Sequence, residues 1–203
     1  MIEFKNVTLS FSDKPIFKDF SNVISEGDKV LLNAPSGAGK STLLKMIMGF
    51  VQPDDGLVLV DSQQIDSDTI KELRQMIAYL PQEVNFPRGK VEDVIKDIFG
   101  FHSNRELVYD QSQVVTLFNE LYLDKSILNS DTNELSGGEK QRLGIVVMRL
   151  LKRKIFLLDE ITSALNSELK TIICDYFMSL DETVIVVSHD DVWKQTNMKR
   201  LEW

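Results

Sequence analysis

A glycine-rich segment with a single lysine, APSGAGKST, occupies residues 34–42 of the chain. It follows a segment typical of a β-strand, and an apolar helical pattern begins within it. Glycines let consecutive backbone amides point to one side and surround phosphate oxygens, while the helix N-terminus and Lys40 add positive potential. The Ser41 hydroxyl can ligate Mg²⁺. The segment therefore predicts a phosphate loop formed by Pro35, Ser36, Gly37, Ala38, Gly39, Lys40, Ser41 and Thr42.

One residue of this loop departs from the usual pattern. The common form is G-x-x-x-x-G-K-[ST], and Ala34 stands at its first glycine. A methyl group is compatible with this position if the φ angle of Ala34 is negative. A glycine-rich turn that binds nothing is the alternative interpretation, but the Gly-Lys-Ser-Thr sequence between a strand and a helix favours phosphate binding.

Two acidic residues end an apolar segment farther along the chain, IFLLDE, residues 155–160. A strand of this composition crosses the core, so Asp159 and Glu160 emerge at its carboxyl end, where ligands bind in open α/β sheets. Asp159 is suited to hold Mg²⁺ opposite Ser41, and Glu160 is suited to polarise an attacking water. The alternative is that both carboxylates only end a strand and cap a helix. The phosphate loop favours the catalytic interpretation.

Two further polar residues follow strand patterns, Gln82 after IAYLP and His189 after VIVVS. Each would more often be an ordinary loop residue. Because the carboxyl ends of parallel strands meet at one sheet edge, we expect both to lie beside the carboxylates. Gln82 could then reach the metal or the water, and His189 could bond the γ-phosphate.

The segment LSGGEKQR, residues 135–142, places two adjacent glycines at the start of an apolar helix. Ser136 and Glu139 form a capping box, so a well-capped helix is one interpretation. A capping box does not require Gly137 and Gly138, which weaken a helix. Glycines at a helix N-terminus expose amides to an anion. The chain thus contains a second predicted phosphate-facing site, which we expect to serve another molecule across an interface.

The composition restricts the class of protein. The chain has 203 residues, a formal net charge of −8 and one cysteine, Cys174. This length suits one domain with a sizeable core, and an acidic surface argues against a nucleic-acid groove. No apolar stretch approaches the length of a membrane span, and the first residues alternate like a strand rather than a signal peptide. We therefore expect a soluble protein in a reducing compartment that reaches a membrane only through a partner.

Alternating strand and helix patterns predict a parallel α/β sheet with right-handed crossovers. Between residues 87 and 151, segments with helical periodicity follow one another without a strand pattern. We interpret residues 87–151 as a helical insert in a single domain whose α/β core comprises residues 1–86 and 152–203. The helices of the insert are expected at 91–101, 106–123 and 137–152, and a short edge strand at 199–203.

The order of these motifs resembles the ATPase subunit of ABC transporters over almost the whole chain. The resemblance rests on APSGAGKST, Gln82, LSGGEKQR, IFLLDE, the segment SALN at residues 163–166 and His189. It implies an α/β fold with a P-loop NTPase (RecA-like) core, a mostly parallel sheet, an N-terminal antiparallel β part and a helical insert. It also implies ATP and Mg²⁺ as cofactors, with Ser41, Gln82 and Asp159 around the metal.

The same resemblance implies that two such chains, as a homodimer or with a paired ATPase subunit, pair head to tail on ATP binding and enclose two ATP molecules. Phe11 corresponds to the aromatic residue that stacks on adenine. The residues that would contact the nucleotide bound by Lys40 of the opposite chain are Ser136, Gly137, Gly138 and Glu139.

An integral membrane transporter subunit is the other partner that the resemblance implies, which places the chain in the cytoplasm at the inner face of the cell membrane. Gln82 corresponds to the residue that links the metal site to the helical insert, and the segment after it to the region that docks the membrane subunit. Asn166 stands where the family usually has an aspartate that couples the two nucleotide sites. DEITSAL and NELSGGEKQR are most similar to small ATPases paired with one membrane protein, including a group linked to export of metals such as iron.

Two alternatives stay open: a non-hydrolysing nucleotide switch, which Ala34 and Asn166 allow, and a soluble ABC-type ATPase that acts on DNA or ribosomes. Glu160 and His189 favour hydrolysis. The acidic charge and the length of the chain count against a nucleic-acid partner. We therefore predict an ATPase that couples ATP binding and hydrolysis to the movement of a substrate through its membrane partner.

Overall fold

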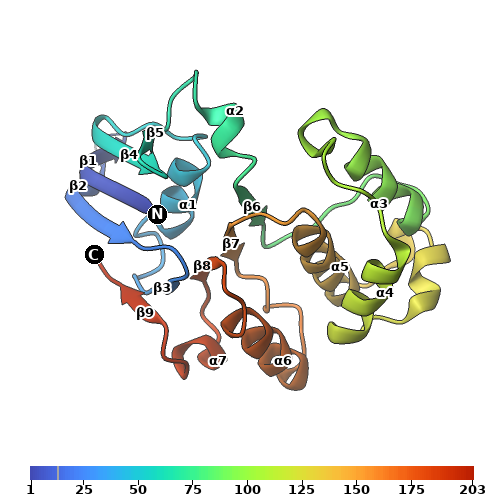
Figure 1. Ribbon diagram of the computed structural model, residues 1–203. Coiled ribbons are helices and arrows are strands. Elements are labelled where there is room, and N and C mark those ends of the chain that lie inside the picture. The colour runs from blue at the N-terminus through green and yellow to red at the C-terminus, as the bar shows by residue number, and fades with distance from the viewer. Residues whose placement is uncertain (13) are drawn as a thin grey trace.

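The computed structural model describes residues 1–12 and 14–203 and contains two sheets with helices around them (Figure 1). The strands are β1 Ile2–Phe11, β2 Lys14–Ile24, β3 Lys29–Leu32, β4 Asp55–Val60, β5 Gln63–Gln64, β6 Ile77–Leu80, β7 Ile155–Asp159, β8 Thr183–Val187 and β9 Lys199–Leu201. The helices are α1 Lys40–Ile47, α2 Ile70–Leu73, α3 Val91–Gly100, α4 Gln111–Glu120, α5 Gly137–Leu150, α6 Ser167–Met178 and α7 Asp191–Lys194, with short 3₁₀ segments at His102–Asn104, Lys125–Asn129 and Thr132–Glu134.

The central sheet is parallel, in the order β6-β7-β8-β3-β9, which confirms the predicted α/β fold with a parallel sheet. Strand β7 is buried along its whole length because both faces of the sheet are covered. Phe156 and Leu158 pack into an apolar cluster that includes α5 and α6, whereas Ile155 and Leu157 pack into a second cluster with α1 and the N-terminal sheet. Successive side chains of β7 thus point to opposite faces of the sheet and contribute to both apolar clusters.

The N-terminal sheet is antiparallel, in the order β2-β1-β4-β5. It lies beside α1, on the side of the molecule opposite α3, α4 and α5 (Figure 1). Its apolar face shares a cluster with α1, so the helix that starts in the glycine-rich loop is buried between the two sheets. This sheet is the antiparallel β part that the resemblance implies.

The predicted edge strand is confirmed, since β9 pairs only with β3 at the border of the described parallel sheet. Residues 87–151 contain α3, α4, α5 and the 3₁₀ segments. Within the described residues, their one strand-like contact is an isolated bridge between Lys90 and Asp131. The expected helix from residue 106 is too long: α4 begins at Gln111, because the Asp110 side chain accepts the Ser112 amide and caps the helix there.

No helix within the described residues has both the length and the apolarity that crossing a bilayer requires.

Gly56, near the start of β4, provides a stability prediction because it lies opposite an irregularity in the pairing of β1 with β4. Gly56 has a φ of 85°, and a Cβ there would come within 2.4 Å of the backbone oxygens of Lys5 and Asn6 on the neighbouring strand. Backbone atoms of a paired strand cannot move aside, and the left-handed conformation adds strain for any L-residue. We expect Gly56→Ala to lower the free energy of unfolding by at least about 2 kcal/mol in urea denaturation.

The matched control is Gly100→Ala, because a Cβ at that last residue of α3 meets no atom within 4 Å and its φ is not positive. Its unfolding free energy should stay constant or rise by up to about 1 kcal/mol through helix propensity. Equal losses in both variants would contradict the assigned role of the Gly56 backbone.

Candidate active site

A cavity of about 580 Å³ opens at the carboxyl edge of the parallel sheet, where β3, β7 and β8 end. It gathers residues from five separate regions of the chain that the sequence analysis had singled out. Its lining consists of Phe11, Ile16, Ser36, Gly37, Gly39, Lys40, Ser41, Thr42, Gln82, Asp159, Glu160, Val187 and His189.

The glycine-rich loop has the backbone shape that the sequence predicts for a phosphate loop. Gly37 and Gly39 have φ angles of 77° and 98°, and a Cβ on Gly39 would lie 2.3 Å from the Ile16 side chain. Only glycine satisfies both demands at residue 39. Ala34 is not among the residues with positive φ, so the condition for a methyl group at this position is met.

Lys40 begins α1 and is largely buried beneath the loop. Its Nζ donates to the carbonyl oxygens of Ala34 at 2.7 Å and Pro35 at 3.2 Å. Pro35 and Ala38 do not line the cavity; they contribute backbone groups, with the Ala38 amide donating to the Pro35 carbonyl at 3.1 Å. The loop is therefore closed on itself by the same ammonium group that faces the cavity.

Asp159 at the end of β7 is held by two hydroxyl groups. The Ser41 hydroxyl lies 3.5 Å from Oδ1, and the Tyr79 hydroxyl donates to Oδ2 at 3.2 Å. Burial and the neighbouring Asp159 raise the pKa of Tyr79 to about 12, so this phenol stays a proton donor at neutral pH. Tyr79 is a residue that the sequence analysis missed, because only the pairing of β6 with β7 brings it to this carboxylate.

The oxygen atoms at this point fit a magnesium ion. Ser41, Gln82 and Asp159 supply a hydroxyl, an amide and one carboxylate to the same cavity. Among the described residues, no group of three or more histidine, cysteine or acidic side chains could form a metal site by itself. A site with few protein oxygen ligands suits Mg²⁺, because this ion usually retains several water ligands and also binds the phosphates of the substrate.

Glu160 adopts a strained backbone conformation, with a φ of 53°. Its amide donates to the Val187 carbonyl at 2.8 Å, and its own carbonyl accepts the Ser163 hydroxyl at 2.8 Å. The His189 amide donates to Oε2 of Glu160 at 3.2 Å, and the two side chains approach to 3.5 Å. A left-handed glutamate at a cavity is a conformation that proteins retain at functional sites.

The loop that carries His189 is anchored by its next residue, Asp190. The Thr162 hydroxyl and the Lys170 ammonium group each donate to the Asp190 carboxylate at 2.5 Å. Burial raises the pKa of Asp190, but the bonds from Lys170 and Thr162 outweigh it and hold this pKa below its ordinary value. The network ties the segments after β7 and β8 together at neutral pH.

The LSGGEKQR segment does not line this cavity. Ser136 caps α5, its hydroxyl donates to Glu139 at 2.6 Å, and the Glu139 amide donates back to Ser136 Oγ at 3.3 Å. The bond from Ser136 is the main cause that lowers the pKa of Glu139. Gly138 also has a packing role, since a Cβ there would lie 3.2 Å from the Leu165 side chain. The predicted capping box is confirmed. Close packing against Leu165 is a second reason why a glycine occupies position 138.

The sequence analysis did not foresee two further contacts, one between regions of the chain and one local. The buried Gln141 of α5 donates through Nε2 to the Gln82 carbonyl at 2.6 Å, which links the cavity edge to the helix that starts with the glycine pair. Asn166 caps α6 by accepting the Leu169 amide at 2.9 Å. The neutral residue at this position therefore has a local role that an aspartate could also fill.

A family profile described as "ABC transporter" matches residues 17–163. This chain belongs to the ABC transporter family. It is 31% identical over 198 residues to the "Ergothioneine transport ATP-binding protein EgtV" of Helicobacter pylori (strain G27), covering 94% of this chain and 91% of that protein. It is also 34% identical over 172 residues to the "Iron-sulfur clusters transporter atm1, mitochondrial" of Neurospora crassa, covering 82% of this chain and 24% of that protein.

The fold is that of a solved ABC cassette. The structure described as "Dimeric Structure of MJ0796, a Bacterial ABC Transporter Cassette" has a TM-score of 0.83 and 26% identity, and covers 100% of this chain and 94% of that one. The predicted family and the predicted P-loop NTPase fold are thereby confirmed. The chain spans only a quarter of the length of the Neurospora ABC transporter but nearly all of the Helicobacter relative.

The bond between Gln141 and Gln82 leads to a test of communication within the site. Gln141→Met keeps the side-chain length and removes the donor, and it also removes the amide oxygen that is buried without a partner in the described residues. We expect faster amide hydrogen exchange in residues 82–86 and an ATPase rate lowered about three- to tenfold, which corresponds to one hydrogen bond.

Nucleotide affinity of the Gln141→Met variant should stay within a factor of two, because Gln141 does not line the cavity. An unchanged exchange rate in residues 82–86 would show that the bond does not restrain this segment.

Proposed function

We propose that this chain is the ATP-hydrolysing subunit of an ABC transporter. The observation that carries the proposal is that Lys40, Ser41 and Asp159 line the same open cavity as Glu160 and His189. These side chains have the chemical types needed to bind a triphosphate and to activate a water.

Each part of the cavity has a role in this reaction. The loop amides and Lys40 bind the β- and γ-phosphates, and Ser41, Gln82 and Asp159 would hold Mg²⁺, which neutralises charge on the phosphates when bound. Phe11, 48% exposed at the cavity, stacks on the adenine ring.

Glu160 accepts a proton from the attacking water, and His189 donates a hydrogen bond to the γ-phosphate. The contact between Glu160 and His189 orients both groups toward one position in the cavity. This pair favours hydrolysis over a nucleotide switch that does not turn over. The similar chain described as the "post-hydrolysis state of the ATP-binding cassette MJ0796 bound to ADP and Pi" supports the same assignment, at 27% identity and a TM-score of 0.81.

A second ATPase chain completes the site. The cavity is lined by residues of the phosphate loop and the sheet edge, whereas Ser136 and Gly137 are exposed elsewhere at the start of α5. The first amides of a helix lack partners within the helix, so this exposed end can bind the γ-phosphate held by an opposing chain. We propose a head-to-tail dimer with two shared ATP molecules, as the dimeric similar structure supports.

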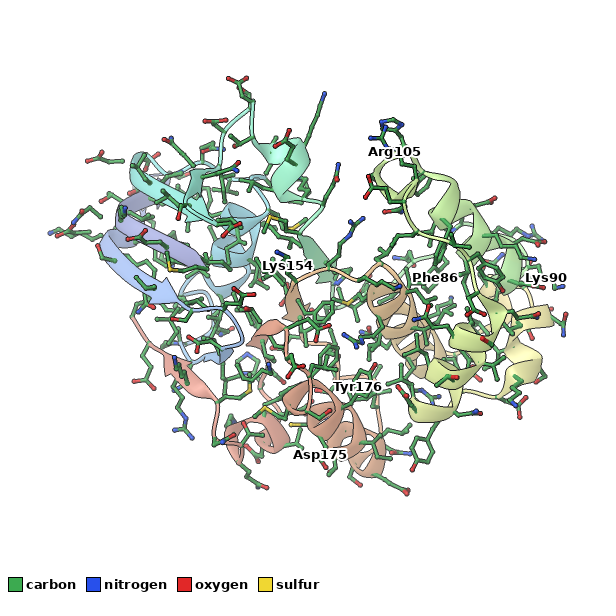
Figure 2. The ribbon with its side chains drawn as sticks, viewed as in Figure 1. Phe86, Lys90, Arg105, Lys154, Asp175 and Tyr176 are labelled. Atoms are coloured by element: carbon green, nitrogen blue, oxygen red, sulfur yellow. The ribbon has the colours of Figure 1, made fainter. Side chains whose placement is uncertain are left out.

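An apolar groove of about 440 Å³ is the proposed docking site for the membrane subunit. It lies between the end of β6, the segment after Gln82 and α5, and Phe86 and Phe101 contribute to its lining. Figure 2 shows Phe86 beside the helical part of the molecule. The charged residues that line the groove are Arg74 and Arg153, and neither forms an ion pair among the described residues of this acidic chain.

We therefore propose that the membrane subunit inserts a short helix with an apolar face and acidic side chains into the groove. This contact would hold the chain at the cytoplasmic face of the cell membrane.

The role of Glu160 can be tested by Glu160→Gln, which keeps the side-chain size and removes the base. We expect ATP to bind with wild-type affinity, hydrolysis to fall by about 10²–10³-fold, and a closed dimer to accumulate with ATP during size-exclusion chromatography. Lys40→Ala is the control that should lose binding itself. Phosphate release by Glu160→Gln at the wild-type rate would remove Glu160 from the mechanism.

The docking groove can be tested by Phe86→Glu, which puts a negative charge beside the proposed acidic helix. We expect loss of co-purification with the membrane subunit while the ATPase rate of the isolated chain is retained. Val108→Glu is the matched control, since Val108 is 83% exposed and lies outside the groove. Equal membrane-subunit recovery with both variants would exclude this groove as the docking site.

A further inference from the structure

The side chain of Trp203 is bonded directly to the phosphate loop. Its indole Nε1 donates a hydrogen bond to the carbonyl oxygen of Ala38 at 2.8 Å. Ala38 lies between Gly37 and Gly39, the two loop residues with positive φ. The contact joins residues 165 positions apart, so it depends on the folded sheet and not on local sequence.

The bond is the last of a series that runs from the edge strand to the loop. Strand β9 pairs with β3 up to Leu32 and Leu201, and the Asn33 amide continues the ladder by donating to the Leu201 carbonyl at 2.9 Å. The Asn33 side chain then donates to Glu202 Oε1 at 2.5 Å. Residues 201–203 thus run alongside the segment that leads from the end of β3 into the phosphate loop.

An aromatic cluster fixes the position of the indole ring. The centroid of the Trp203 ring lies 5.5 Å from that of Phe17 and 5.8 Å from that of Phe20. The Phe17 ring in turn lies 3.2 Å from the position where a Cβ on Gly39 would stand. Ala38 and Gly39 therefore both contact this aromatic cluster. Packing against Phe17 and Phe20 restricts rotation of the indole ring.

The geometry of the peptide unit gives this bond a consequence for phosphate binding. In a trans peptide the carbonyl and the following N–H point in opposite directions, and no cis peptide occurs in the described chain. When Trp203 holds the Ala38 carbonyl on its side of the loop, the Gly39 amide points to the other side. Gly39 lines the cavity, whereas Ala38 does not.

From this geometry we propose that Trp203 is a positioning residue of the phosphate loop: its indole N–H fixes the peptide between residues 38 and 39, so that the Gly39 amide is aimed at the bound phosphates. The proposal rests on the proposed function, because it assigns the cavity to a nucleoside triphosphate. Trp203 itself touches the loop and not the phosphates.

The test uses Trp203→Phe, which keeps an aromatic ring against Phe17 and removes only the donor. Binding of ATP and ADP, measured by calorimetry with Mg²⁺ well below the unfolding temperature, should weaken about three- to tenfold, as expected for one hydrogen bond. Amide hydrogen exchange in residues 36–40 of the nucleotide-free variant should accelerate, because the loop peptide is then free to rotate. Arg200→Ala is the control: this exposed residue of β9 bonds to the Lys194 carbonyl and not to the loop, so both readouts should remain at wild-type values.

Wild-type affinity of Trp203→Phe, whether or not exchange in residues 36–40 changes, would overturn the proposal. An equal loss of affinity in Arg200→Ala would also overturn it, since general loosening of the edge strand would then be the cause. Failure of the wild-type chain to bind either nucleotide is a separate outcome, which would remove the proposed function and the role of Trp203 with it.

Discussion

The parallel pairing of β7 with β8 is the constraint on which the candidate site depends. The ladder runs to its last pair, Asp159 with Val187, so the two strands end at the same level of the sheet. Glu160 is the first residue after β7 and His189 the second residue after β8, and the two residues meet there. A register shift of one residue would move every buried side chain of β7 to the opposite face and separate the two groups. Packing on both faces of the sheet therefore fixes the relative positions of Glu160 and His189 in the candidate site.

Glu160, at the carboxyl edge of the parallel sheet, has a strained backbone that the packing of the core must compensate. A glutamate with positive φ costs about 1–3 kcal/mol relative to a relaxed backbone. Hydrogen bonds from the Glu160 amide to Val187 and from Ser163 to the Glu160 carbonyl offset part of this cost. The strain turns the carboxylate toward His189 and the cavity instead of along the strand. The packing free energy of the buried sheet therefore maintains a backbone conformation at Glu160 that the residue would not prefer by itself.

The sequence was sufficient to predict those parts of the candidate site that are formed by residues close together in the chain. The phosphate loop, the acidic residues after β7 and the cap of α5 are local patterns, so their residues could be named in advance. Tyr79, Gln141 and Trp203 could not, because their contacts depend on strand order and on the packing of α5. The helix expected from residue 106 fails for a local reason, since apolar periodicity continued past the Asp110 cap that sets the start of α4. The roles assigned to the residues in the cavity are predictions.

The contacts of α5 explain how an exposed helix end can be linked to a cavity that it does not line. Gln141 bonds the backbone of Gln82 at the cavity edge, and Gly138 lies against Leu165 in the segment that follows Glu160. The hydrogen bond is short at 2.6 Å, and Gly138 leaves no room for a side chain beside Leu165, so a displacement of either segment must move α5 or break a contact. If a bound nucleotide shifts Gln82, the amides at the start of α5 shift with it. The contacts of α5 thus provide a physical connection between the cavity and the proposed contact site at the start of α5.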